Sequence, residues 1–231
     1  MIKGKCFSKV NRGKRNKNDL YQTPPSLTQE IINREMKDEL KGSFILEPAC
    51  GFNAIVNVLK DNGFYNIDHT DLAWGKDLNV KRVQGIDFFK LNDDKYNFYM
   101  YEDFNKKIEF SYCEYEFIKY QYVITNPPYS LAKEFVLNAK KICRKKIIML
   151  LKLDFLHGQN RLEELWRDKE FPLKKVYVLS RYPMLKDTVR DDGKFNTGMQ
   201  TYGWYVWEKE YKGNPEIEWI DINKYVVRKG E

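Results

Sequence analysis

The chain has 231 residues, of which 42% are hydrophobic and 15% aromatic, and this composition excludes an intrinsically disordered protein. Its net charge of +7 is compatible with a polyanionic partner. The longest apolar runs, such as 147–151, are too short to span a bilayer, and the basic N-terminus lacks the apolar segment of a secretory signal. The four cysteines are scattered without a CxxC pair, so we expect a cytoplasmic protein with neither a zinc site nor a disulfide framework.

Residues 1–19 form a basic and polar segment, which predicts either a solvated tail or an arm that contacts phosphate groups. Residues 20–231 contain neither an internal repeat nor a Gly/Ser linker, so we expect them to form a single domain. The domain is expected to begin with a helix capped by Ser26 or Thr28. The apolar positions of this helix are Leu27, Ile31, Ile32 and Leu40.

Strand-like apolar runs then alternate with amphipathic helices. The predicted strands lie within 44–46, 65–73, 85–89, 121–125, 145–156, 174–184 and 200–209, and the predicted helices within 53–64, 131–143 and 161–171. The last strand, with its alternating aromatic residues, is expected to end the fold. This alternation predicts an α/β fold with a doubly wound, mostly parallel sheet.

Unusual residues follow the first two strands, and ligands of open α/β sheets bind beyond the carboxyl ends of strands. Glu47 ends the first strand, and Gly51 permits a tight turn in front of helix amides that could bind an anion. A glycine is also common in such loops for steric reasons alone. Asp71 could accept hydrogen bonds from two ribose hydroxyls, with Asp68 as the competing candidate and a surface acid as the alternative.

A third strand end is predicted at residues 85–89. Asp87 could accept a hydrogen bond from an adenine amine, and Phe88 could cover the face of that ring. For one of the two rings, Phe88 or Phe89, the expected role is ordinary core packing.

The segment NPPY, residues 126–129, follows the strand 121–125. Its two prolines fix the backbone and remove two N–H donors, which leaves carbonyl oxygens and the Asn126 amide oxygen. An acceptor-rich edge of this kind complements an exocyclic –NH₂ group, and Tyr129 offers a flat face for stacking. The alternative is a rigid turn after a strand.

These motifs together resemble a known family. EPACG (47–51) followed by NPPY, with YQTPP at 21–25, is similar to the S-adenosylmethionine-dependent amino-methyltransferases of DNA. The runs LLKLDFLHGQNR and GWYVWEK resemble small phage-type adenine-N6 enzymes, and the similarity extends from about residue 21 to about residue 209. Self-protection against restriction is one biological role that such a resemblance suggests.

The resemblance implies a Rossmann-like class I methyltransferase sheet with an antiparallel edge strand, without a large separate target-recognition domain. It also implies S-adenosylmethionine as cofactor and double-stranded DNA with a flipped-out adenine as partner, in the host cytoplasm if the gene is phage-encoded. No feature of the sequence indicates an oligomeric state or a membrane partner. The implied cofactor-binding residues are Tyr21, Thr23, Pro24, Glu47, Ala49, Gly51, Asp71, Asp87 and Phe88, and the implied target-base residues are Asn126, Pro127, Pro128 and Tyr129.

This chain departs from the family pattern at two positions. Asn53 stands where the cofactor loop usually has a second glycine, and asparagine tolerates a left-handed backbone. Asn126 replaces the acid often found at the start of the target motif, so no carboxylate base is available there.

The implied reaction is methyl transfer to an amine held by Asn126 Oδ1 and the Pro127 carbonyl. Cytosine-N4, RNA and protein-glutamine substrates remain alternatives because each presents a planar amine, and an inactive DNA-binding relic of the fold is a further one. Cytosine ring-carbon methylation is disfavoured because no Pro-Cys pair occurs. Only the segments 92–119 and 181–200 are left to read a DNA sequence, which predicts a weak or short sequence preference.

Overall fold

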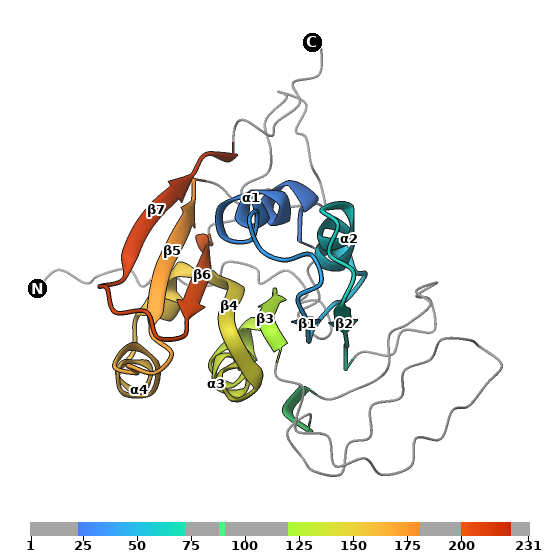
Figure 1. Cartoon of the computed structure of the whole chain (residues 1–231). Coiled ribbons are helices and arrows are strands. Elements are labelled where there is room, and N and C mark those ends of the chain that lie inside the picture. Colours follow the sequence, from blue (N-terminus) through green and yellow to red (C-terminus); the bar gives the residue numbers. More distant parts are fainter. Residues whose placement is uncertain (1–22, 73–87, 91–119, 181–199, 223–231) are drawn as a thin grey trace, which may run out of the picture.

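The computed structural model describes residues 23–72, 88–90, 120–180 and 200–222, and its strands form one seven-stranded sheet in the order β2-β1-β3-β4-β6-β5-β7 (Figure 1). The strands are β1 (Ile45–Glu47), β2 (Ile67–His69), β3 (Tyr120–Thr125), β4 (Cys143–Lys152), β5 (Leu173–Leu179), β6 (Tyr202–Glu208) and β7 (Glu216–Ile220). The helices are α1 (Pro25–Glu35), α2 (Ala54–Asp61), α3 (Ala132–Ile142) and α4 (Gln159–Arg161), and α4 continues into the π-helical turn η5 (Leu162–Trp166). Three 3₁₀ turns complete the elements: η2 (Phe88–Lys90), η3 (Tyr129–Leu131) and η4 (Leu153–Leu156).

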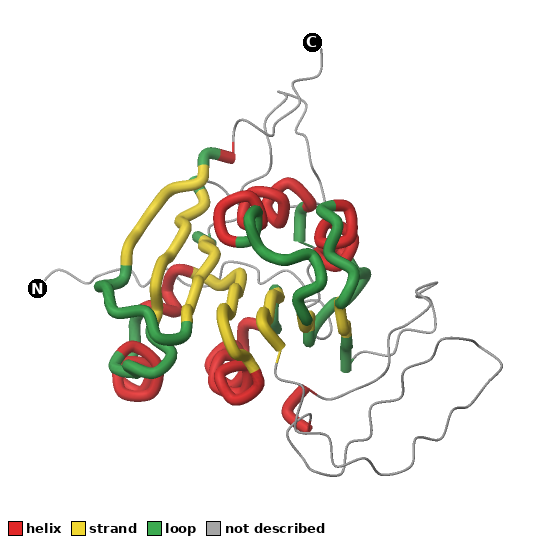
Figure 2. Tube along the Cα trace, in the orientation of Figure 1, coloured by secondary structure: helices red, strands yellow, loops and turns green. Residues whose placement is uncertain are grey.

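Helices cover both faces of the sheet. Helices α1 and α2 lie on one face, and α3 and α4 lie on the other (Figures 1 and 2). The central strand β4 is buried from Ile147 to Leu151, as expected for a strand between two helical layers. Its side chains alternate between two hydrophobic clusters, with Ile147 facing the α3 side and Ile148 the α1 side. The sequence forms one continuous apolar run here because each face needs its own apolar residues.

The order of the strands determines where a ligand can bind. Strands β2, β1, β3 and β4 are parallel neighbours, so their carboxyl ends meet at one edge of the sheet. The chain passes from β1 outward to β2 and then returns to β3 on the opposite side of β1. This reversal is a topological switch point, where the crossovers diverge and leave a crevice. In this strand order the switch point lies between the carboxyl ends of β1 and β3.

The predicted doubly wound, mostly parallel class is confirmed, with a correction to the antiparallel strand. The antiparallel strand is β6, and it lies between β4 and β5 instead of at the edge. Residues Trp204 to Trp207 are fully buried, so both faces of β6 are apolar, which suits an interior strand. The edge strand β7 was not predicted, although its charged and apolar residues alternate at strand spacing, and it pairs in parallel with β5.

The first helix also differs from the prediction. Helix α1 begins at Pro25, so Ser26 and Thr28 lie inside it and cap nothing. A proline at the first helical position needs no partner for an N–H group and has a suitable φ. The helix ends at Glu35, and Leu40 lies beyond it on the surface.

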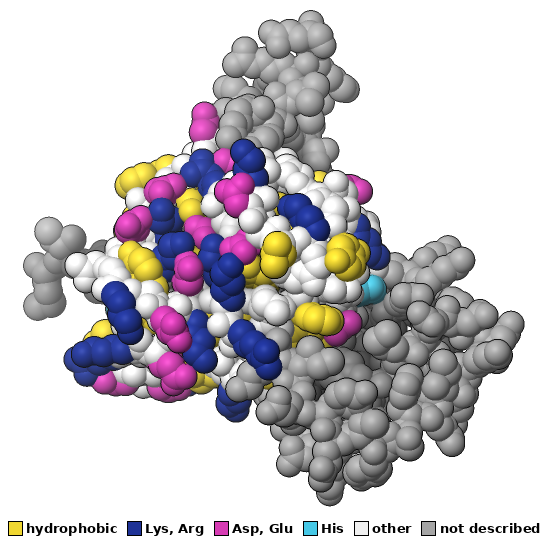
Figure 3. Space-filling model, viewed as in Figure 1, with side chains coloured by type: hydrophobic (Ala, Val, Ile, Leu, Met, Phe, Trp, Pro, Cys, Tyr) yellow, Lys and Arg dark blue, Asp and Glu magenta, His cyan; other side chains and the backbone are white. Residues whose placement is uncertain are grey.

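Charges of both signs are mixed on the surface. The face shown in Figure 3 carries Lys and Arg side chains interspersed with Asp and Glu side chains. Ion pairs account for part of this mixture, among them Arg34 with Glu218 at 3.0 Å and Lys174 with Glu208 at 2.6 Å. In the part of the chain that the structure describes, no helix has the length and apolar character needed to cross a bilayer.

Candidate active site

Glu47 is a buried carboxyl group at the carboxyl end of β1, with 2% of its surface exposed. No described residue hydrogen-bonds its Oε2 atom, although that atom is fully buried. Burial, and to a smaller extent the charge of Asp71, raise the pKa of Glu47 well above the usual value, while the backbone amide of Val56 opposes this shift. A buried acceptor without a donor is costly, so Glu47 is suited to receive a donor from a ligand.

Backbone hydrogen bonds join the loop after β1 to the end of β2. The Thr70 amide donates to the Glu47 carbonyl, and the Cys50 amide donates to the Thr70 carbonyl, both at 2.9 Å. The Gly51 amide donates to Oδ2 of Asp71 at 2.8 Å. Gly51 has φ of 47°, a left-handed conformation that glycine adopts without steric cost. The two predicted sites, Gly51 and Asp71, are therefore in direct contact.

Asn53 adopts the backbone conformation that the expected second glycine would have. Its φ and ψ are 62° and 26°, in the left-handed region, and α2 begins at the next residue. Among the described residues, the buried Oδ1 of Asn53 has no hydrogen-bond partner. Asparagine is one of the few residues other than glycine that tolerate this conformation.

The NPPY segment follows β3, immediately beside the end of β1. Nδ2 of Asn126 donates to Oγ1 of Thr23 at 3.1 Å, which places Thr23, just before α1, next to the NPPY segment. The 3₁₀ turn η3 begins at Tyr129. The segment from Asn126 to Tyr129 therefore lies at the switch point, as its position after a parallel strand requires.

The ring of Tyr129 packs against residues from two further strands. The Tyr202 ring, at the start of β6, lies 5.4 Å from it between centroids, at an interplanar angle of 44°. Nζ of Lys152, at the end of β4, lies 5.4 Å from the Tyr129 centroid. The register of β4 and β6 places Lys152 and Tyr202 opposite each other. Sequence reasoning missed both residues, because no local signal reveals a pairing of residues 50 positions apart.

Other predicted residues are placed differently or lie outside the described part. Phe88 is 2% exposed and packs on Phe135 with centroids 4.9 Å apart, so it belongs to the core, whereas Phe89 is 38% exposed. Asp68 accepts a hydrogen bond from the Tyr120 hydroxyl at 2.8 Å, which gives it a structural partner. Ala49 is partly buried against the cluster on the α3 side, and Pro24 precedes α1. Tyr21, Asp87 and the basic segment 1–19 lie outside the described residues.

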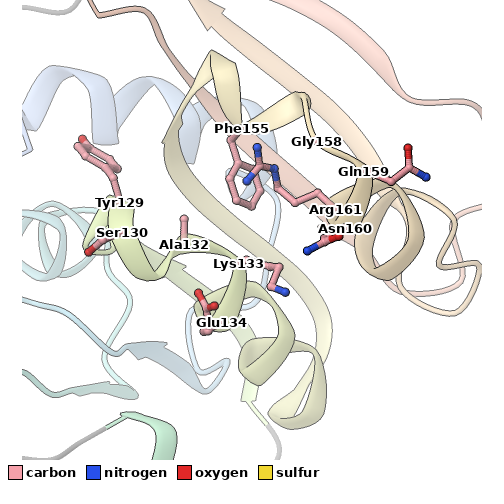
Figure 4. Close-up of a pocket in the computed structure, with 10 residues that line it drawn as sticks. All are labelled: Tyr129, Ser130, Ala132, Lys133, Glu134, Phe155, Gly158, Gln159, Asn160 and Arg161. Carbon is pink, nitrogen blue, oxygen red and sulfur yellow. The ribbon is translucent and has the colours of Figure 1, made fainter.

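A pocket of about 450 Å³ opens beside the NPPY segment (Figure 4). It lies between the start of α3 and the segment from η4 to α4. The guanidinium of Arg161 lies over the Phe155 ring, 5.0 Å from its centroid. Lys133 contributes a second cation from α3 and pairs with Glu164 at 3.0 Å. The lining residues whose side chains offer hydrogen-bond donors are Tyr129, Ser130, Lys133, Gln159, Asn160 and Arg161.

Comparison with known proteins gives similarity in structure but not in sequence. No family model matches the chain, and no curated protein matches it. A provisionally assigned RNA methyltransferase from Pyrococcus horikoshii is 13% identical with a TM-score of 0.56, over 84% of this chain and 88% of that protein. The modification subunit of a provisionally assigned type I restriction enzyme from Vibrio vulnificus YJ016 is 12% identical with a TM-score of 0.57. In that comparison 92% of this chain aligns with 48% of the subunit, so the chain spans about half of its length.

A third similar structure has a name that identifies the fold. It is a provisionally assigned class I S-adenosylmethionine-dependent methyltransferase from Listeria monocytogenes, 13% identical, with a TM-score of 0.52 over 91% of this chain and 68% of that protein. The strand order, the switch point between β1 and β3, and these likenesses agree. The chain therefore has the class I fold of S-adenosylmethionine-dependent methyltransferases.

Proposed function

We propose that the chain uses S-adenosylmethionine to methylate the exocyclic N6 amine of adenine in DNA. The observation that carries this proposal is the position of the NPPY segment, at the switch point beside the Glu47–Asp71 end of the sheet. Substrate and cofactor groups at neighbouring strand ends would meet in one crevice. The type I modification subunit of similar fold supports a DNA substrate, and the NPPY sequence supports an amine acceptor.

The residues near β1 and β2 fit the cofactor. The ammonium group at its amino-acid end would supply the donor that buried Glu47 Oε2 lacks among the described residues. Its ribose hydroxyls would donate to the carboxylate of Asp71. Bound S-adenosylmethionine supplies a methyl group on a positively charged sulfur, which is already reactive toward an amine.

The NPPY segment would hold and activate the target amine. Asn126 Oδ1 and the Pro127 carbonyl would each accept one amine hydrogen, which exposes the nitrogen lone pair and stabilises the positive charge that develops on nitrogen. The methylated amine nitrogen, which then carries a positive charge, would release a proton to water. Because Asn126 is not a carboxylate, its role is to orient the amine and stabilise charge.

A base inside a duplex must leave the stack before it reaches this segment. Extrusion costs roughly a few kcal/mol. Stacking on an aromatic ring such as that of Tyr129 would return about 1–3 kcal/mol, which offsets much of that cost. The cations of the neighbouring pocket, Lys133 and Arg161, would contact the phosphate backbone.

The test is methyl transfer from labelled S-adenosylmethionine to unmethylated DNA, RNA and protein, followed by separation of the digested products. We expect label in N6-methyldeoxyadenosine. Label only in cytosine, RNA or glutamine would identify one of the alternative substrates, and the structural likeness to an RNA methyltransferase makes RNA the first of these to examine. Cofactor binding without any transfer would identify an inactive relic.

The Asn126→Ala variant tests the role that is proposed for Asn126 in methyl transfer. We expect transfer to fall by about 10²–10³-fold, with cofactor affinity retained. Asn57→Ala, an exposed position on α2, is the matched control and should leave transfer unchanged. Persistent transfer in Asn126→Ala would show that the assigned role is wrong.

A further inference from the structure

We infer that Thr23 is a positioning residue that orients the side-chain amide of Asn126, in addition to any contact that it makes with the cofactor. Nδ2 of Asn126 donates to the Thr23 hydroxyl oxygen at 3.1 Å, between residues 103 positions apart in the sequence. The Thr23 side chain is buried, with 3% of its surface exposed. This inference rests on the proposed function and identifies how the amine-binding group obtains its orientation.

The orientation of the amide decides whether the site can hold an amine. An asparagine side chain has an oxygen branch that accepts hydrogen bonds and a nitrogen branch of similar shape that donates them. If the nitrogen branch faced the substrate, the N–H donors of Asn126 would face the N–H donors of the substrate amine. The hydrogen bond to Thr23 directs the nitrogen branch toward the start of α1, and the oxygen branch consequently points in a different direction. With Thr23 as the acceptor, the amide is held in an orientation in which its oxygen branch is turned away from Thr23.

Thr23 and Asn126 are held on one rigid frame. The far end of α1 is anchored through Glu35, which accepts a hydrogen bond from the Tyr177 hydroxyl at 2.6 Å and whose carbonyl accepts one from Lys146 Nζ at 2.9 Å. Lys146 lies on β4 at the position paired with Tyr122 of β3, the strand that leads to Asn126. The hydroxyl and the amide are therefore preorganised by buried contacts to neighbouring strands.

Thr23→Val tests this role, because valine keeps the shape of threonine and removes the hydroxyl. The loss of one orienting hydrogen bond is expected to lower kcat about tenfold. With kcat measured at saturating cofactor, the KM for DNA should stay unchanged, and Thr23→Ser should restore most of kcat. Thr28→Val is the matched control, since Thr28 is fully buried on α1 and its hydroxyl has no partner among the described residues.

Three outcomes would overturn the inference. They are an unchanged kcat in Thr23→Val, an equal loss of kcat in Thr28→Val, and a loss of cofactor affinity that accounts for the whole effect. A readout independent of turnover is hydrogen exchange of the Asn126 side-chain amide, measured by ¹⁵N NMR with the resonance assigned through Asn126→Asp. Exchange should be slow in the wild-type protein and fast in Thr23→Val, and equal rates would contradict the hydrogen bond.

The same experiments separate this inference from the proposed function. A wild-type protein that transfers no methyl group to nucleic acid overturns the proposed function and the positioning role with it. An active wild-type protein whose Thr23→Val variant keeps its full kcat overturns the positioning role alone.

Discussion

The backbone amide of Gly51 and the carboxylate of Asp71 form a hydrogen bond of 2.8 Å, which joins the loop after β1 to the end of β2. One oxygen of the carboxylate thus holds the loop that is proposed to bind the cofactor. The same carboxylate is proposed to receive the ribose hydroxyls. The conformation of the loop after β1 and the proposed binding of the ribose therefore both depend on the Asp71 side chain.

Asp71→Ala should weaken cofactor binding by about 10–100-fold, because it removes two or more hydrogen bonds to a charged acceptor. Asp68→Asn is the matched control. The amide oxygen introduced by this substitution can still accept a hydrogen bond from the Tyr120 hydroxyl, so cofactor affinity should stay close to the wild-type value. Calorimetric titration with S-adenosylmethionine measures both. A stronger effect at residue 68 than at residue 71 would reverse the proposed assignment.

Glu47 should make cofactor affinity depend on pH. Burial raises the pKa of Glu47 in the ligand-free protein, and an ammonium group bound beside it would lower that pKa in the complex. Binding then releases a proton at pH values between the two pKa values. Affinity should therefore rise with pH by at most about tenfold per pH unit in this window and level off above the ligand-free pKa.

Glu47→Gln should weaken binding and abolish this pH dependence. The variant should also stabilise the ligand-free protein at neutral pH. The pKa of Glu47 is raised by folding, so the stability that its protonation supplies is complete below the unfolded-state pKa, about 4.3, and is lost as pH rises through the folded-state pKa. Urea unfolding at several pH values measures this difference. Equal pH profiles for the two proteins would contradict the prediction.

Asn53→Ala should lower the free energy of unfolding by at most about 1 kcal/mol, because the short polar side chain of asparagine makes the left-handed conformation less unfavourable than it is for alanine. Asn53→Gly should cost less than alanine, because glycine adopts this conformation freely. Asn57→Ala, exposed on the same helix, should be neutral or stabilising. Urea unfolding compares the three variants, and equal stability of the alanine and glycine variants at position 53 would contradict the backbone argument.

The pocket beside Tyr129 predicts a salt-dependent contribution to DNA binding. Arg161→Ala should weaken binding at low salt and reduce the slope of log K against log salt concentration by about 1, as expected for one lost phosphate contact. Arg167→Ala is the control, since Arg167 pairs with Glu163 outside this pocket. Fluorescence anisotropy with labelled DNA at several salt concentrations measures the slope. An unchanged slope in Arg161→Ala would exclude this contact.

The buried network around Glu35 should be important for stability. Glu35 pairs with Lys146 at 3.2 Å, and both side chains are at least nine-tenths buried. Glu35→Ala removes the nearer carboxylate of Lys146 and leaves only Glu39 at 3.5 Å, so it should cost about 3 kcal/mol. Glu163→Ala, which removes an exposed partner of Arg167 outside this network, should cost about 1 kcal/mol or less. Denaturant unfolding of both variants tests the difference, and similar costs would show that burial does not govern this network.

Sequence patterns identified most of the sheet because the evidence was local. The run Ile147–Leu151 is apolar at every position, and the helix 54–61 places Ile55, Val56 and Leu59 on one face. The strand β7 was missed although Ile217 and Trp219 alternate with glutamates at strand spacing, because the segment is short and lacks a continuous apolar run, and both side chains remain exposed. Its membership of the sheet depends on pairing with β5, a strand distant in sequence, in a register that places Lys175 beside Glu216.

The sequence by itself determined the class of fold and the order of its motifs, because hydrophobic periodicity, proline positions and strand-end acids are encoded in short segments. Only the tertiary structure decided which residues meet. It placed Phe88 in the core, paired Asn126 with Thr23, and packed Tyr202 and Lys152 around Tyr129. It also placed β6 inside the sheet. These relationships depend on strand order and register, which are set by the burial of side chains distant in sequence, and no local pattern contains that information.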